Sequence, residues 1–295
     1  MILLNEREYA EQCIRNNDIG KNPYDTIVIL SKYYYHVMNY KPKRIKVLLK
    51  DFLELTYPRY SVDKQDWINT IEGLASAAHN NELFESDGVW ITNKELEKIK
   101  ELNNIPLEKL AFTLLCLAKY YNQRKSNDNN WVYTEIKEIF EMAGVNCPRK
   151  LRAKKIGTLI RKGYIRYATP VGNLNIQVLF VDNTNDKQLL IDDFRVLGNE
   201  YLYYNGGNYI RCAECGKLVK NNKYGNKKYC SECATYNPQE TKQVKCVDCG
   251  KLITVHSMNN ETCRCDDCYS IYRANRKLET QRIRRAKEKM KSAQF

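Results

Sequence analysis

The spacing of apolar and polar positions predicts helices through the first hundred residues. Apolar side chains recur every three or four positions, which is typical of helices that bury one face. Pro23 and Pro42 favour helix starts, because a first turn does not need the N–H that proline lacks. GVWIT at 88–92 indicates a short buried strand, and Thr92 with Glu95 fits a capping box. The helices are expected at residues 5–16, 23–38, 42–55 and 63–79, within a helical domain of residues 1–103.

The next segment, residues 104–183, predicts three helices followed by a β-hairpin. An apolar helix (PLEKLAFTLLCLAKYY) precedes a polar loop and a second helical stretch, WVYTEIKEIFEMAGV. The third helix is framed by Pro148 at its start and Gly163 at its end. YIRYAT and LNIQVLFVD then flank a turn containing Pro170, Gly172 and Asn173. This is the element order of a winged helix, so the expected fold class is mainly α with a hairpin wing.

Two further features complete the helical part. A helix is predicted from Asp192 to Tyr203, with the acidic residues at its start, inside a helix-and-linker segment of residues 184–210 that ends in Asn-Gly-Gly. The three consecutive tyrosines at 33–35 cannot share one helix face, so some of them are expected to be exposed. Core or interface packing is favoured for them over a platform for bases.

Cysteine spacing indicates two metal sites. Nine of the 12 cysteines fall between residues 212 and 268, which in a reducing compartment points to metal and not to disulfides. Two units, each with a paired Cys-x-x-Cys, repeat at an offset of 34 to 35 residues, and they predict two zinc ribbons at 211–238 and 243–270. The expected ligands are Cys212, Cys215, Cys230 and Cys233 in the first, and Cys246, Cys249, Cys265 and Cys268 in the second.

Four thiolates complete the tetrahedron that Zn²⁺ prefers, so both predicted zinc ions are structural and leave no open position for catalysis. Gly216 and Gly250 follow the second cysteine of each unit, where a positive φ is expected to point backbone N–H groups at sulfur. Cys263 is an alternative ligand to Cys265 if the register slips by two residues. Alignment of YCSEC with RCDDC favours Cys265.

The repeated block RCAECGK…KYCSECA, followed by a helix rich in Tyr, Arg and Lys, resembles zinc-ribbon proteins of bacteriophages and mobile elements. The resemblance covers about a quarter of the chain and implies a module that binds nucleic acid or a partner, in the cytoplasm of a bacterial host cell. It supplies no catalytic residues. The middle segment, with AFTLLCLAKYY and EIKEIFEMAGV, resembles winged-helix domains of replication initiators and transcription regulators.

Positive charge is concentrated in the last part of the chain. Residues 211–295 carry 19 Lys and Arg against 9 Asp and Glu, or +10 of the net +13. Two zinc–thiolate centres would lower that +10 to about +6. The tail of residues 271–295 is expected to be a helix with a basic stripe that follows a phosphate backbone, the alternative being a solvated helix that contacts nothing. The residues proposed to contact nucleic acid here are Arg273, Arg276, Lys277, Arg284 and Arg285.

The third helix of the middle segment has a second basic surface. Ile156, Leu159 and Ile160 share one side, and cationic residues form a stripe on the other. In a winged helix this is the element that enters a major groove, although such domains also serve as protein-contact modules or spacers. The residues predicted to contact DNA are Lys150, Lys154 and Arg161, with Arg166 of the hairpin reaching the flanking backbone.

The sequence contains no phosphate-binding or zinc-protease motif, and His36, His79 and His256 are far apart along the chain. No apolar run approaches the length of a membrane span, and the N-terminus becomes charged too early for a signal peptide. We therefore expect a non-enzymatic protein without a small-molecule substrate or membrane contact. Its predicted role is to bind double-stranded DNA in transcription or replication control. One alternative is a phage inhibitor or adaptor that binds a host or defence complex. RNA binding through the ribbons and exposed tyrosines is a weaker alternative, because the sequence shows no single-strand-binding motif.

Overall fold

The computed structural model is mainly helical, with small antiparallel sheets. It divides into two compact units. Unit 1 comprises residues 1–210 and 217–221, and unit 2 comprises residues 211–216 and 222–295. The structure describes residues 2–168, 175–184, 186–223, 225–236, 241–256 and 263–292.

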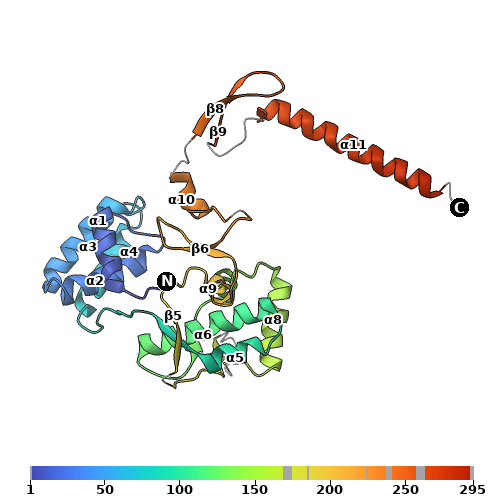
Figure 1. Ribbon diagram of the computed structural model, residues 1–295. Helices are drawn as coiled ribbons and strands as arrows, with labels where there is room; N and C mark the ends of the chain where they lie inside the picture. The colour runs from blue at the N-terminus through green and yellow to red at the C-terminus, as the bar shows by residue number, and fades with distance from the viewer. Residues whose placement is uncertain are drawn as a thin grey trace. The chain divides into compact units, whose positions relative to one another are not determined.

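The first four helices gather into one group, drawn in blue in Figure 1, around a core of their own. Pro23 and Pro42 occupy the first turns of α2 and α3, as predicted. Tyr33 and Tyr34 are buried in this core and Tyr35 is half-buried. The expectation that part of this tyrosine run is openly exposed is therefore wrong. The helices are α1 (Glu6–Asn16), α2 (Pro23–His36), α3 (Pro42–Thr56) and α4 (Lys64–Ala77).

The rest of unit 1 is built around α6 (Ile105–Lys125), which packs against β1, α5, α7, α8 and α9. Because neighbours surround it, apolar residues occupy most of its circumference. Thr92 and Glu95 form the predicted capping box at the start of α5. The remaining elements are β1 (Val89–Thr92), α5 (Asn93–Lys100), β2 (Trp131–Val132), α7 (Ile136–Met142), α8 (Arg149–Arg161), β3 (Ile165–Tyr167), β4 (Ile176–Val178), β5 (Lys187–Ile191) and α9 (Leu197–Tyr204).

The predicted hairpin forms from β3 and β4, which pair antiparallel with Arg166 opposite Gln177. Strand β2 joins the other edge of β4, so the sheet has three strands in the order β2-β4-β3. The predicted turn residues Pro170, Gly172 and Asn173 lie outside the described residues. The helix before the hairpin begins at Arg149, with Pro148 as its N-cap, and Gly163 follows its end with a φ of +76°.

The core around α6 extends beyond both ends of the segment 104–183. Strand β1 pairs antiparallel with β5, so residues 89–92 and 187–191 belong to one sheet. Helix α9 packs on α6, with the rings of Phe112 and Tyr201 5.3 Å apart. Residues from Val89 to Tyr201 thus share one core.

The helix predicted from Asp192 starts five residues later, at Leu197. Asp193 accepts the backbone N–H of Arg195 at 2.9 Å and pairs with the guanidinium of Arg195 at 2.8 Å. These contacts hold residues 193–195 in a turn, and so the prediction that the two aspartates cap the helix is wrong. Val196, in non-helical conformation, is the N-cap.

One buried carboxylate joins the two helical groups of unit 1. The side chain of Glu6 is fully buried and contacts Lys32 Nζ at 2.7 Å, Arg124 Nη2 at 2.5 Å and the backbone N–H of Phe84 at 3.1 Å. Burial by itself raises the pKa of Glu6, but these donors and positive charges together lower it below its ordinary value. The ion pairs therefore link α1 and α2 to α6.

The described residues between 209 and 292 form two short hairpins and two helices. Strand β6 pairs with β7, and β8 pairs with β9 in a register that places Val244 opposite Ile253. Within the described part of the chain, no helix combines the length and apolar character needed to cross a bilayer. The elements are β6 (Tyr209–Arg211), β7 (Leu218–Lys220), α10 (Ser231–Tyr236), β8 (Thr241–Lys245), β9 (Leu252–His256) and α11 (Asp266–Ser292).

Candidate metal centres and nucleic-acid interface

The structure brings the eight predicted cysteines together as two sets of four. Within each set the sulfur atoms all lie within 4.8 Å of one another. The distance from Cys215 Sγ to Cys230 Sγ is 3.8 Å, and from Cys249 Sγ to Cys265 Sγ it is 3.7 Å. Sulfurs at the corners of a tetrahedron with Zn–S bonds of about 2.3 Å are about 3.8 Å apart. Both sets could therefore hold a metal ion, and their all-thiolate chemistry fits zinc.

Tight turns set the first pair of sulfurs in each site. Gly216 and Gly250 both have a φ of +72°, as predicted. Their own N–H groups donate to the carbonyl oxygens of Cys212 and Cys246 at 2.9 Å. Each five-residue turn, 212–216 and 246–250, is thus closed by a hydrogen bond between backbone groups. Other backbone N–H groups of the two turns point at sulfur, as predicted. Sulfur accepts from other amides, since the N–H of Cys265 lies 3.3 Å from Cys246 Sγ.

Backbone donors favour thiolate at the first cysteine of each site. Burial opposes ionisation of Cys212, but N–H groups of Cys215, Cys230 and Glu214 lower its pKa to about 6. N–H groups of Cys265 and Cys249 likewise lower the pKa of Cys246 to about 6. The first ligand of each site is thus prepared to bind a cation.

Cys263 does not belong to either set of four among the described residues. Its carbonyl oxygen accepts the N–H of Val247 at 3.0 Å. This bond pairs the segment before Cys265 with the first turn of the same site. The register with Cys265 and Cys268 is therefore the one that the fold adopts.

Each site ends in a helix. Helix α10 begins between Cys230 and Cys233, and α11 begins between Cys265 and Cys268. In the second site, Arg264 donates to Asp248 Oδ2 at 2.6 Å, and its guanidinium carbon lies 4.1 Å from the ring centroid of Tyr272. Arg264 thereby ties the first cysteine turn to the second turn of α11. This contact was not predicted from the sequence, in which the opposite charges at positions 248 and 264 were the available signal.

The basic face predicted on α8 is solvent-exposed. Lys150, Lys154 and Arg161 are exposed, whereas Ile156 and Leu159 are buried against the core around α6. Arg166 is exposed on β3, and its Nε donates to Gln177 Oε1 at 2.5 Å. Gln177 in turn donates to the carbonyl oxygen of Asn129 at 2.8 Å. Arg166 is therefore held by the residue opposite it on the neighbouring strand.

The predicted basic residues of the tail lie on α11. Arg273, Arg276 and Lys277 are exposed. Together with Tyr269, Tyr272 and Thr280 they line a shallow hollow of about 310 Å³. The side chains of Arg284 and Arg285 lie outside the described part of the chain.

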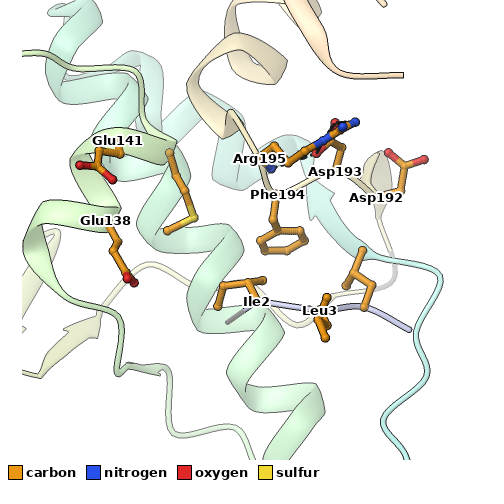
Figure 2. Close-up of a pocket in the computed structure, with 10 residues that line it drawn as sticks. Ile2, Leu3, Glu138, Glu141, Asp192, Asp193, Phe194 and Arg195 are labelled. Carbon is orange, nitrogen blue, oxygen red and sulfur yellow. Dashed lines mark hydrogen bonds and ion pairs between the residues drawn. The ribbon is translucent and has the colours of Figure 1, made fainter. Parts of the chain in front are cut away.

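One hollow on the described surface of unit 1 is acidic (Figure 2). It measures about 500 Å³, and Phe194 and Ile2 lie in its middle, with Glu138 and Glu141 on one side and Asp192 on the other. None of its lining residues is His, Cys or Ser. Its carboxylates would repel a phosphate backbone, so this surface does not suit nucleic acid.

His36 and His79, far apart in sequence, both lie beside the ring of Tyr35, with centroid distances of 5.0 and 6.1 Å. His36 Nε2 lies 3.1 Å from the carbonyl oxygens of Ala78 and Asn81. These contacts connect α2 to the end of α4. The side chain of His256 lies outside the described part of the chain.

No protein-family model matches this chain, and no curated protein or solved structure shows significant similarity to it.

Proposed function

We propose that this protein binds double-stranded DNA through a winged helix, contains two structural zinc ions in ribbon-like units, and acts in transcription or replication control of a phage or mobile element. The observation that carries the proposal is the two-sided character of α8. Its basic side is exposed, while Ile156 and Leu159 on the other side are fixed in the core.

The order of elements supports this assignment. Helices α6, α7 and α8 precede the β3–β4 hairpin, as in a winged helix, and α8 is third in that order. A helix of this kind fits the major groove of B-DNA, where Lys and Arg contact phosphates and base edges. Arg166, steadied by Gln177, stands on the hairpin where flanking backbone would pass.

The zinc ions have a structural role in this proposal. Four thiolates fill the tetrahedral coordination of zinc and leave no position for a substrate. Bound zinc would fix the two turns of each site and the start of the helix that follows. In the second site the residues that orient the helix are Cys265, Cys268 and Arg264. The basic residues of α11 would then add sequence-independent affinity through phosphate contacts.

The test is fluorescence anisotropy of the zinc-loaded full-length protein with a labelled random 30-base-pair duplex over a salt series. A variant carrying both Lys154→Ala and Arg161→Ala should lower affinity about tenfold at moderate salt. It should also reduce the slope of log affinity against log salt by about two, because each phosphate contact contributes about 0.9.

The matched control removes two exposed cations elsewhere in unit 1, Arg59 and Lys94, whose side chains are 73% and 78% exposed. The Arg59→Ala and Lys94→Ala double variant should keep the wild-type slope. Equal losses in both double variants would show that only net charge matters and that α8 is not the contact surface. Absence of duplex binding even at low salt would overturn the proposal and make a protein partner the leading hypothesis.

A further inference from the structure

Two aromatic rings at the start of α11 are exposed to solvent. Tyr269 is 54% exposed and Tyr272 is 39% exposed. They are three residues apart, so they lie on neighbouring turns of the same helix, separated by about 4.5 Å along its axis.

The surface around the rings is cationic. Arg273, Arg276 and Lys277 continue from the tyrosines along the same side of the helix, and they line the hollow of about 310 Å³ with them. The residues that line this hollow include three cations and no carboxylate. Aromatic rings that share a hollow with three cations fit a ligand with flat rings and negative groups.

The second cysteine site holds the rings in position. The N–H of Tyr269 donates to the carbonyl oxygen of Cys265 at 2.8 Å, inside the helical turn that carries the ligand Cys268. Arg264 lies over the ring of Tyr272 at 4.1 Å and is itself anchored to Asp248. The rings therefore stand on a helical turn that bound metal would fix, and ordering them costs little on binding.

We propose that this surface, Tyr269 and Tyr272 with Arg273, Arg276 and Lys277, binds single-stranded nucleic acid by stacking unpaired bases on the tyrosines and pairing phosphates with the cations. The inference rests on the proposed nucleic-acid function and adds a second ligand form to it. A duplex hides the faces of its bases, so stacking on Tyr269 is available only to an unpaired strand. The site accordingly suits a melted or displaced strand.

The experiment compares Tyr269→Ala with wild type in the full-length, zinc-loaded protein. The probes are labelled 12-nucleotide oligothymidine, oligouridine of the same length and a 12-base-pair duplex. Base stacking on an aromatic side chain contributes about 1–3 kcal/mol, so Tyr269→Ala should bind the single strand about 5- to 150-fold more weakly. Its duplex affinity should stay within twofold of wild type. Oligothymidine and oligouridine distinguish a DNA from an RNA strand.

Two controls keep the result specific. Tyr269→Phe retains the ring and should bind the single strand like wild type, whereas Tyr203→Ala removes a tyrosine that is 49% exposed on α9 and should have no effect. The metal content of Tyr269→Ala, measured by native mass spectrometry, should equal that of wild type.

The inference fails if Tyr269→Ala binds the single strand as tightly as wild type, or loses single-strand and duplex affinity equally. The outcomes separate it from the proposed function. If duplex binding depends on α8 but Tyr269→Ala does not change single-strand binding, the inference is refuted and the proposed function stands. If single-strand binding depends on Tyr269 and no duplex binding is found, the duplex proposal is refuted and the inference stands.

Discussion

Replacement of Glu6 by glutamine tests whether one buried charge couples the two helical groups of unit 1. The carboxylate is fully buried and contacts Lys32, Arg124 and the N–H of Phe84. Glu6→Gln keeps the volume but removes the charge, and it leaves two cations without their counterion. Removing one partner of a buried ion pair costs about 3–5 kcal/mol. Because the side chains of Lys32 and Arg124 are 13% and 33% exposed, water can partly replace the carboxylate, and the expected loss is about 3 kcal/mol.

The effect should depend on pH in a defined direction. The pKa of Glu6 is lower in the folded protein than its ordinary value of 4.5. The stabilisation is therefore fully present above that ordinary value, and it is lost as pH falls through the lower pKa of the folded state. The difference between wild type and Glu6→Gln should be largest at neutral pH and shrink in acid.

The measurement is urea unfolding followed by tryptophan fluorescence. All three tryptophans, at positions 67, 90 and 131, lie in unit 1, so the signal reports that unit. Glu11→Gln serves as control. Glu11 forms an exposed pair with Arg7, and glutamine can keep its hydrogen bond with Tyr33, so the stability should change by less than about 0.5 kcal/mol. A Glu6→Gln loss no larger than that of the control, or a loss that does not change with pH, would refute the coupling argument.

Three other predictions concern packing and metal content. Gly198→Ala would place a methyl group against the backbone carbonyl at the end of α7, well inside van der Waals contact, and should lower the free energy of unfolding by about 3 kcal/mol in the same urea assay. Tyr201→Phe removes a buried 2.9 Å hydrogen bond to Glu108 and should cost about 2 kcal/mol, since the carboxylate loses a donor that water cannot easily replace. Cys268→Ser should reduce the bound zinc counted by native mass spectrometry from two ions per chain to one, whereas Cys263→Ser should leave it at two.

Local sequence signals predicted local structure well. Pro23, Pro42 and the Thr92 capping box mark helix starts that the structure contains, because each acts within a single turn. The cysteine sets were predictable for the same reason, since a Cys-x-x-Cys turn fixes two sulfurs and only one further pair lies at ribbon spacing. The exposed face of α8 followed from helical periodicity alone.

Long-range pairing was not predictable in this way. Nothing in GVWIT identifies residues 187–191, about a hundred positions later, as its partner strand. The sequence pattern places the start of α9 too early. The carboxylate of Asp193 binds the backbone and side chain of Arg195, and it is therefore not available to cap a helix. The role of Glu6 depends on cations at positions 32 and 124, which only the tertiary fold brings together.

The pairing of β1 with β5 also sets an order of events during synthesis. The last buried residue in the core of α1 to α4 is Ala78, whereas the core around α6 needs β5 and Tyr201. At typical translation rates of about 5–20 residues per second, the 123 residues between those points take on the order of 10 s. Strand β1 and helix α6 are synthesised early in that interval, before β5 and α9 are available to pack against them. The nascent chain therefore passes through a stage in which every buried residue of the first bundle has been made, while the long apolar helix still lacks the partners that cover it.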